Sequence, residues 1–187
     1  AILDTLAQYN VKATFFVVGK EDEESQEMYK RIVNEGHTLG MHSYSHQYKE
    51  IYQSMDAFQA DYERISNCLT AATGIKPLYY RFPGGSTEVT EKLQMTDLDA
   101  YFNAQGASYF DWNVIAANNT TDDVSVNKMV DSVMNGVALY DTSIVLMYDS
   151  VDRKMTAKSL DSILDYLLKN GYEILPIDEN TIPIHHS

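Results

Sequence analysis

The sequence predicts an α/β protein whose parallel strands are joined by crossover helices. Short apolar runs rich in Phe, Val, Ile and Tyr alternate along the chain with longer amphipathic stretches. This alternation favours parallel pairing, because each helix carries the chain back to the same edge of the sheet before the next strand begins. The 187 residues contain no repeat or linker, so we expect a single domain over residues 1–187, with a sheet that is open and doubly wound or closed as a barrel.

The predicted strands are mostly continuous apolar runs. ATFFVV at residues 13–18 and SIVLM at residues 143–147 suit strands that are covered on both faces. SYFDWNV at residues 108–114 is rich in the aromatic and β-branched residues that strands favour. The full set of predicted strands is 13–18, 38–41, 79–82, 108–114, 143–147 and 172–177.

The predicted helices are recognised by their apolar period and by glycines near their ends. The clearest is the stretch around residues 160–168, where apolar residues recur at i, i+3, i+4, i+7 and i+8 before Gly171. Gly36 and Gly74 end two earlier helices in the same way. The other predicted helices are 1–9, 23–35, 55–72, 89–95 and 125–137.

The composition argues against several classes of partner. The formal net charge is −13 and the pI is near 4.6, whereas binding to nucleic acid or to an anionic membrane surface requires clustered Lys and Arg. No apolar run approaches the roughly 20 residues of a membrane span. The single cysteine, Cys68, cannot form an internal disulfide and is expected to be a buried thiol on a helix face. Neutral partners such as glycans are compatible with this charge.

Polar side chains follow the ends of four predicted strands. Parallel strands deliver the residues at their carboxyl ends to one edge of the sheet, where the active sites of such folds lie. We therefore expect four separate segments to converge on one site. The residues concerned are His42, His46, Arg81, Pro83, Gly84, Asn118, Asn119, Tyr148 and Asp149.

His42 and His46 form the strongest single motif. If this segment turns helically, residues four apart share one face, and two neutral imidazoles can then bind one divalent ion. The alternative is a pair of unrelated surface histidines, and the spacing alone leaves that alternative open. Their place directly after the predicted strand 38–41 favours a metal site.

Arg81 and Trp112 carry weaker signals. Arg81 begins the segment RFPGG, in which a rigid turn could hold its guanidinium against a carboxylate in a bidentate pair. A purely structural arginine fits the same pattern. Trp112, the only tryptophan, could stack on a sugar ring, although a lone tryptophan on a strand more often belongs to the core.

Five segments, taken in order, resemble the polysaccharide deacetylase family, carbohydrate esterase family 4, whose shared region is the NodB homology domain. The resemblance runs from Leu3 to about Ile184, almost the whole chain. The segments are similar to the first helix and second strand, the His-x-x-x-His metal motif, the Arg-x-Pro-x-Gly motif, and the fourth and fifth motifs of that family. The segments are LDTLAQYNVKATFFVVG, GHTLGMHSYSH, YRFPGGS, FDWNV and IVLMYDS.

The resemblance implies a distorted (β/α) barrel of about seven β/α units. It also implies a site with one divalent metal, most commonly zinc, between an aspartate and two histidines. His42 and His46 match those histidines, and Arg81 matches the arginine that orients the catalytic base. Pro83 and Gly84 of the same motif, together with Trp112, are expected to bind substrate.

Three departures from the family pattern bear on activity. The Asp-Asp motif of the family supplies the third metal ligand and the base, and we expect it, with the first strand, upstream of Ala1, so that the domain is N-terminally incomplete. Tyr148 falls at the position of the general-acid histidine, and the usual tyrosine pKa of about 10 is poorly matched to neutral pH. Asn118 falls at the position of the aspartate that tunes this histidine, and Asn119 at a position often held by tryptophan.

The resemblance implies metal-dependent hydrolysis of acetyl groups from an N-acetylglucosamine polymer such as peptidoglycan or chitin, with catalysis weakened by Tyr148 and Asn118. Two alternatives stay open: an O-acetyl xylan esterase, and a degenerate deacetylase that binds glycan or metal without hydrolysis. Because such polymers lie outside the cell, we expect an extracellular or cell-surface location, although no signal peptide is seen.

Overall fold

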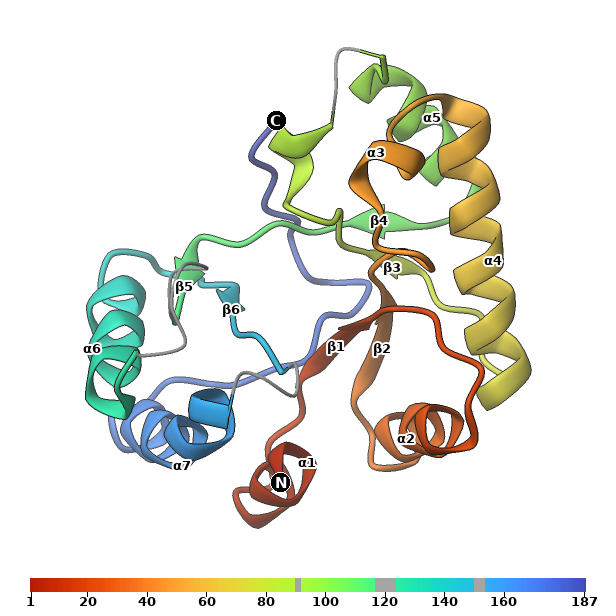
Figure 1. Ribbon diagram of the computed structural model, residues 1–187. Helices are drawn as coiled ribbons and strands as arrows, with labels where there is room; N and C mark the ends of the chain where they lie inside the picture. The colour runs from red at the N-terminus through yellow and green to blue at the C-terminus, as the bar shows by residue number, and fades with distance from the viewer. Residues whose placement is uncertain (90–91, 117–123, 150–153) are drawn as a thin grey trace. The chain divides into compact units, whose positions relative to one another are not determined.

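The computed structural model describes residues 1–89, 92–116, 124–149 and 154–187, and it shows an α/β protein (Figure 1). Every strand pair in these ranges is parallel, which confirms the predicted fold class. The chain divides into two compact units, and each contains one sheet, so the single domain stays a prediction. The larger unit comprises Thr14–Asp111 and Pro176–Ser187, and the smaller unit comprises Ala1–Ala13 and Trp112–Leu175.

The larger unit contains a four-stranded parallel sheet with the strand order β1-β2-β3-β4. Val17, Met41 and Tyr80 are register partners across the first three strands, so these strands end at one edge of the sheet. The strands are β1 (Thr14–Val17), β2 (Thr38–Met41), β3 (Tyr79–Tyr80) and β4 (Ser108–Tyr109).

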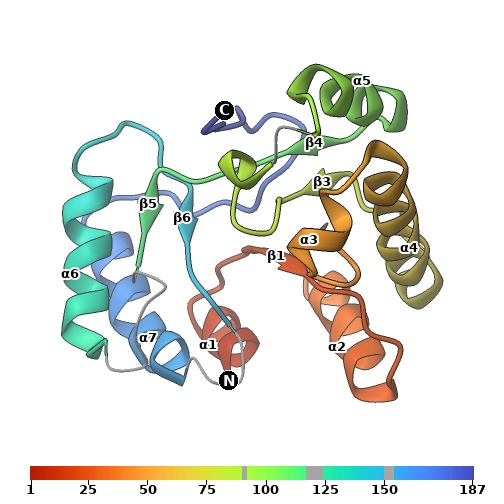
Figure 2. The same cartoon turned by 45° about the horizontal axis from the view of Figure 1, so that its top comes forward.

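Two helices of this unit begin and end where the sequence signals predict. α2 (Glu23–Asn34) is capped by Asp22, whose carboxylate accepts a hydrogen bond from Ser25 N at 2.9 Å. α4 (Met55–Thr73) ends at Gly74, which adopts a left-handed φ of 74° that glycine tolerates without strain. Figures 1 and 2 both show α2 next to α4.

Aromatic side chains form the core beneath α4. Phe58 is 0% exposed, and its ring centroid lies 5.6 Å from that of Tyr80 and 5.8 Å from that of Phe82. Tilted and edge-to-face rings at such separations stabilise a core beyond the area that they bury. Phe58 makes further ring contacts with Tyr62, Tyr101 and Phe102.

The smaller unit packs two long helices against a two-stranded parallel sheet. α6 (Val126–Val137) and α7 (Lys154–Lys169) lie side by side in both views (Figures 1 and 2). β5 (Val114–Ile115) pairs with β6 (Val145–Leu146). The buried core of this unit consists of Val114, Ala116, Met129, Val133, Val137, Ile163 and Leu167.

Two further contacts hold the smaller unit together. α1 (Ile2–Gln8) is joined to α7 through Tyr9, whose hydroxyl donates to the Asp161 carboxylate at 2.8 Å. Gly136 lets α6 approach β5 closely, since a Cβ at this position would lie 2.5 Å from Val114 Cγ1. Within the ranges given above, none of the helices has the length and apolarity that crossing a bilayer demands.

Two strand predictions are wrong, both because backbone groups bond outside a ladder. The predicted strand 108–114 is two short strands in different sheets, β4 and β5, and the Asp111 N–H between them donates to the Ile184 carbonyl at 2.8 Å. The predicted strand 172–177 forms no strand and pairs with none of the strands in the described chain. Its last residue, Ile177, bonds instead to the hydroxyl groups of Thr14 and Thr38.

Two smaller predictions also need correction, and one short helix was not predicted. The predicted helix 89–95 is misplaced. Residues 92–94 are non-helical, and the helix of this region, α5 (Met95–Gln105), begins at the last residue of the predicted range. The four-residue helix α3 (Tyr48–Ile51) is too short to produce an apolar period, and the sequence did not predict it. Cys68 is half-buried rather than buried, because its thiol lies at the rim of α4 and donates to the Lys20 carbonyl at 3.4 Å.

Replacing the central aromatic ring should weaken the larger unit strongly. Phe58→Ala leaves a cavity among five rings, and we expect the free energy of unfolding to fall by about 3–5 kcal/mol. Urea denaturation followed by circular dichroism measures this loss. Met28→Ala, at a position 42% exposed on α2, should change the value by less than about 0.5 kcal/mol. A Phe58→Ala loss below about 1 kcal/mol would contradict the proposed core.

Candidate active site

The candidate site lies at the carboxyl ends of β2 and β3. His42 directly follows β2, and Arg81 directly follows β3. The parallel ladder continues one residue past each strand, because His42 N donates to the Val17 carbonyl and Arg81 N donates to the Met41 carbonyl, both at 2.9 Å. Two residues that are distant in sequence are therefore held at the same edge of the sheet.

The structure brings His42 and His46 together with the backbone of Arg81. His42 Nδ1 lies 2.7 Å from the Arg81 carbonyl oxygen, which can only accept, so this nitrogen carries the proton. The other nitrogen, Nε2, is then bare, and it lies 3.3 Å from His46 Nε2. The segment between the histidines is not helical, so the condition of a helical turn is not met. Positive φ angles at Ser43 (69°) and His46 (55°) bend it back instead.

The separation of the two imidazole nitrogens fits a shared cation. A zinc ion about 2.0–2.1 Å from each of two nitrogens, in tetrahedral geometry, sets those nitrogens about 3.3–3.4 Å apart. The distance between His42 Nε2 and His46 Nε2 is 3.3 Å. No group of three His, Cys, Asp or Glu side chains suited to a metal occurs in the described parts of the chain. The geometry of the histidine pair suits two ligands of one ion, and the binding of a metal there stays a prediction.

Both histidines are biased toward the neutral form that binds metal. Burial lowers the pKa of His42 to about 4, although its bond to the Arg81 carbonyl raises it. Burial also lowers the pKa of His46, against a smaller opposing effect of the Asp61 charge. Neutral imidazole is the form that coordinates a divalent ion, so neither side chain must first lose a proton at pH 7.

The Arg81 side chain is held by carbonyl groups of the neighbouring strand end. Its Nε donates to the Phe110 carbonyl at 3.0 Å, and its Nη2 donates to the Asp111 carbonyl at 3.2 Å. The guanidinium carbon also lies 4.4 Å from the centroid of the Phe16 ring, and the residue is 8% exposed. These contacts give Arg81 a structural role, and the bidentate clamp on a carboxylate stays a prediction.

The turn after Arg81 packs against α3, close to His46. The Pro83 carbonyl accepts a hydrogen bond from the buried Tyr52 hydroxyl at 2.8 Å. Gly84 has a φ of 79°, and a Cβ there would lie 3.0 Å from the Tyr48 ring. Tyr48 in turn packs edge-on against His46, with 5.4 Å between ring centroids. Pro83 and Gly84 thus lie near the histidine pair, and their role in binding substrate stays a prediction.

A fully buried carboxylate fixes the far end of the same turn. Asp111 is 0% exposed and accepts hydrogen bonds from Ser86 N at 2.9 Å, Ser86 Oγ at 2.5 Å and His186 N at 2.8 Å. Sequence reasoning missed Asp111, as it missed Tyr48 and Asp61. An acidic residue inside an apolar strand was the available signal for Asp111.

The remaining predicted site residues belong to the smaller unit or fall outside the described residues. Trp112 and Tyr148 belong to the smaller unit, where each is half-buried and Tyr148 comes shortly after β6. Asn118 and Asn119 lie outside the described residues. Placement of these side chains beside His42 stays a prediction.

Comparison with known proteins identifies the family of this chain. The profile of the family described as polysaccharide deacetylase matches residues 1–102. The peptidoglycan-N-acetylglucosamine deacetylase PgdA of Listeria monocytogenes is 32% identical over 95% of this chain and 34% of its own length. A Bacillus cereus enzyme of the same name is 32% identical over 71% of this chain, so the chain spans less than half of either relative.

Solved structures agree with this match. The catalytic domain of a peptidoglycan N-acetylglucosamine deacetylase from Eubacterium rectale is 34% identical and superposes with a TM-score of 0.90, covering 100% of this chain and 85% of that domain. A mutant of a family pseudoenzyme, with restored enzymatic activity, is 25% identical, with a TM-score of 0.74 over 94% of this chain and 59% of that one. The predicted NodB-type (β/α) fold is thereby confirmed. The chain belongs to the polysaccharide deacetylase family.

Proposed function

We propose that this chain is part of a zinc-dependent deacetylase that removes acetyl groups from N-acetylglucosamine polymers, with peptidoglycan as the preferred polymer. The observation that carries the proposal is the approach of two Nε2 atoms to 3.3 Å at the carboxyl edge of the sheet. The family membership and the names of the relatives support the reaction and the polymer. A substrate of this kind lies in the cell wall, so the proposed location is extracellular or at the cell surface.

In this proposal, His42 and His46 hold the divalent ion. When bound, such an ion polarises the acetyl carbonyl and lowers the pKa of a water molecule. The Arg81 carbonyl keeps the His42 ring in one orientation and one tautomer, as partners of metal-binding histidines generally do. The family pattern adds one carboxylate as third ligand and another as base. Arg81, held at the ends of β3 and β4, is the residue proposed to orient that base.

Tyr148 is proposed to stand where the general acid acts. The leaving amine must gain a proton, and a phenol is a weaker acid than an imidazolium, so it donates one less readily. The proposed enzyme is therefore slow. Asn118, which lies outside the described residues, is proposed to stand at the tuning position and would carry no charge there.

A degenerate deacetylase that binds glycan or metal without hydrolysis is the second candidate. Tyr148 favours it, and a solved structure similar to this chain is that of a mutant of a CE4 family pseudoenzyme. An O-acetyl xylan esterase is the variant with another substrate. Comparing acetate release from acetylated chitooligosaccharide, peptidoglycan and acetylated xylan separates these three candidates.

Removing one histidine should slow deacetylation strongly. We expect the protein, expressed with any residues that its gene encodes before Ala1 and supplied with zinc or cobalt, to release acetate from peptidoglycan slowly. His42→Ala should lower the rate by at least about 100-fold, because one metal ligand is lost. His186→Ala changes an exposed histidine of the C-terminal segment and should leave the rate within about twofold. A His42→Ala enzyme as active as the parent would contradict the proposed metal site.

Restoring a histidine at position 148 tests the missing acid. We expect Tyr148→His to raise the rate of acetate release by about 10-fold or more, because a general acid of suitable pKa contributes about 10²–10⁴-fold. Tyr148→Phe removes the hydroxyl and should bring no gain. If Tyr148→His and Tyr148→Phe behave alike, the second candidate, a degenerate deacetylase, is favoured.

Zinc binding should tolerate mild acid. Protons compete with the metal for imidazole nitrogens, so binding weakens as the pH falls through each histidine pKa. Two histidines of ordinary pKa, about 6.5, would lose about tenfold in affinity between about pH 7.5 and pH 6. Because burial lowers the pKa of His42 to about 4 and also lowers that of His46, we expect a loss below about fourfold. Competition with a chelating dye at each pH measures it, and a loss near tenfold would contradict the expectation.

A further inference from the structure

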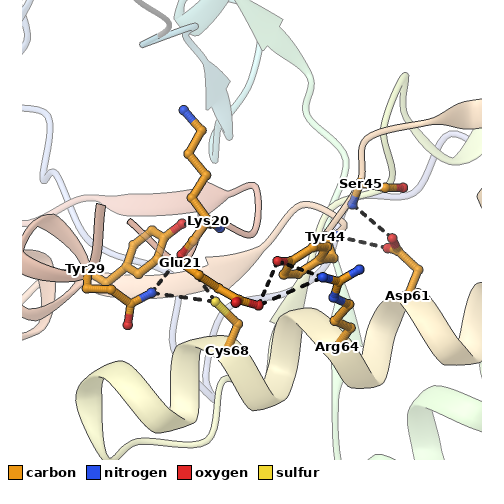
Figure 3. Close-up of polar contacts among 9 residues, drawn as sticks. Lys20, Glu21, Tyr29, Tyr44, Ser45, Asp61, Arg64 and Cys68 are labelled. Carbon is orange, nitrogen blue, oxygen red and sulfur yellow. Dashed lines mark hydrogen bonds and ion pairs between the residues drawn. The ribbon is translucent and has the colours of Figure 1, made fainter. Parts of the chain in front are cut away.

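The loop that carries the two histidines is bound by one carboxylate from α4. This histidine loop comprises residues 42–46. Asp61 Oδ1 accepts hydrogen bonds from Ser43 Oγ at 2.7 Å and from Tyr44 N at 2.9 Å, and its Oδ2 accepts one from Ser45 N at 3.0 Å. Figure 3 shows the carboxylate facing Tyr44 and Ser45 from the helix. Three consecutive residues between the histidines are therefore fixed by a single side chain.

Asp61 is connected to His46 by hydrogen bonds through the Ser43 hydroxyl. Ser43 is 0% exposed, and its hydroxyl accepts a hydrogen bond from His46 N at 3.0 Å while it donates to Asp61. Both Ser43 and His46 have positive φ angles, 69° and 55°, which residues with a side chain adopt only where their surroundings enforce them. The same backbone turn places His46 Nε2 beside His42 Nε2.

The Tyr44 side chain is held by a second set of contacts, with Glu21 and Arg64. Its hydroxyl donates to Glu21 at 2.8 Å and accepts from Arg64 Nη2 at 3.1 Å, and the Arg64 guanidinium carbon lies 3.8 Å from the ring centroid (Figure 3). Gly19 leaves room for the ring, since a Cβ there would collide with Tyr44 Cδ2. The histidine loop is thus held by α4 on its backbone and on its central side chain.

We propose that Asp61 is a positioning residue that sets the spacing of the two imidazoles and thereby the affinity of the metal site. This inference rests on the proposed function. An ionised carboxylate accepts at both oxygens, which suits three donors from the loop. Asparagine has the same shape but offers one acceptor and an NH2 group, so it would leave at least one backbone N–H of the loop facing a donor.

The test compares Asp61→Asn with Glu63→Gln, which removes the same charge from an exposed position of the same helix. Cobalt(II) is titrated into the metal-free protein, expressed with any residues encoded before Ala1, and its absorption gives the dissociation constant. We expect Asp61→Asn to weaken binding by at least about tenfold, as loss of a partner that orients metal ligands does, and Glu63→Gln to leave it within about twofold. Wild-type affinity in Asp61→Asn would overturn the proposal.

A second measurement needs no metal. The amide protons of Tyr44, Ser45 and His46 should exchange with solvent at least about tenfold faster in Asp61→Asn than in the parent, beyond the change that any fall in the free energy of unfolding explains. Unchanged exchange would overturn the proposal. Ser43→Ala serves if Asp61→Asn does not fold, and it should speed the exchange of His46 in particular. If the parent protein bound no cobalt, the proposed function would be contradicted. The role of Asp61 would then be limited to holding the loop.

Discussion

The hydrogen bond between His42 Nδ1 and the Arg81 carbonyl oxygen, 2.7 Å long, is the contact on which the candidate site depends. It forms because β2 and β3 run parallel and their pairing continues past the strand ends through Arg81 N and the Met41 carbonyl. The bond fixes the tautomer and the ring plane of His42, which leaves Nε2 bare toward His46. An antiparallel arrangement would send the residues after these strands to opposite edges.

The backbone N–H groups of loops that follow parallel strands have no neighbouring strand to accept their hydrogen bonds. In the larger unit, the carboxylates of two aspartates accept some of them. Asp61 accepts from the loop after β2, and the buried Asp111 accepts from Ser86 after β3 and from His186 near the C-terminus. Removing such carboxylates from water is unfavourable unless several donors surround them. Each aspartate therefore organises its loop only because the loop supplies those donors.

Apolar runs and the residues that cap helices predicted most of the helices and strands, because burial of a strand on both faces and the capping of a helix both depend on residues adjacent in sequence. They failed at residues 108–114 and 172–177, where the composition suits a strand but the backbone bonds to distant partners. For the site, the spacing of His42 and His46 was a usable signal. No local pattern predicted the role of Asp61. A single acidic residue on a helix is common, and only the folded structure shows that the loop binds to it.

By itself, the sequence determined the alternation of strands and helices, the acidic surface charge and the identity of the residues after β2 and β3, His42 and Arg81 among them. These properties depend on composition and on neighbours within a few positions. Only the tertiary structure decided that two Nε2 atoms meet at 3.3 Å, and that the guanidinium of Arg81 is bound by carbonyl groups. The direction of a ring or a guanidinium depends on hydrogen-bond partners far away in sequence, which come together only when the sheet has formed.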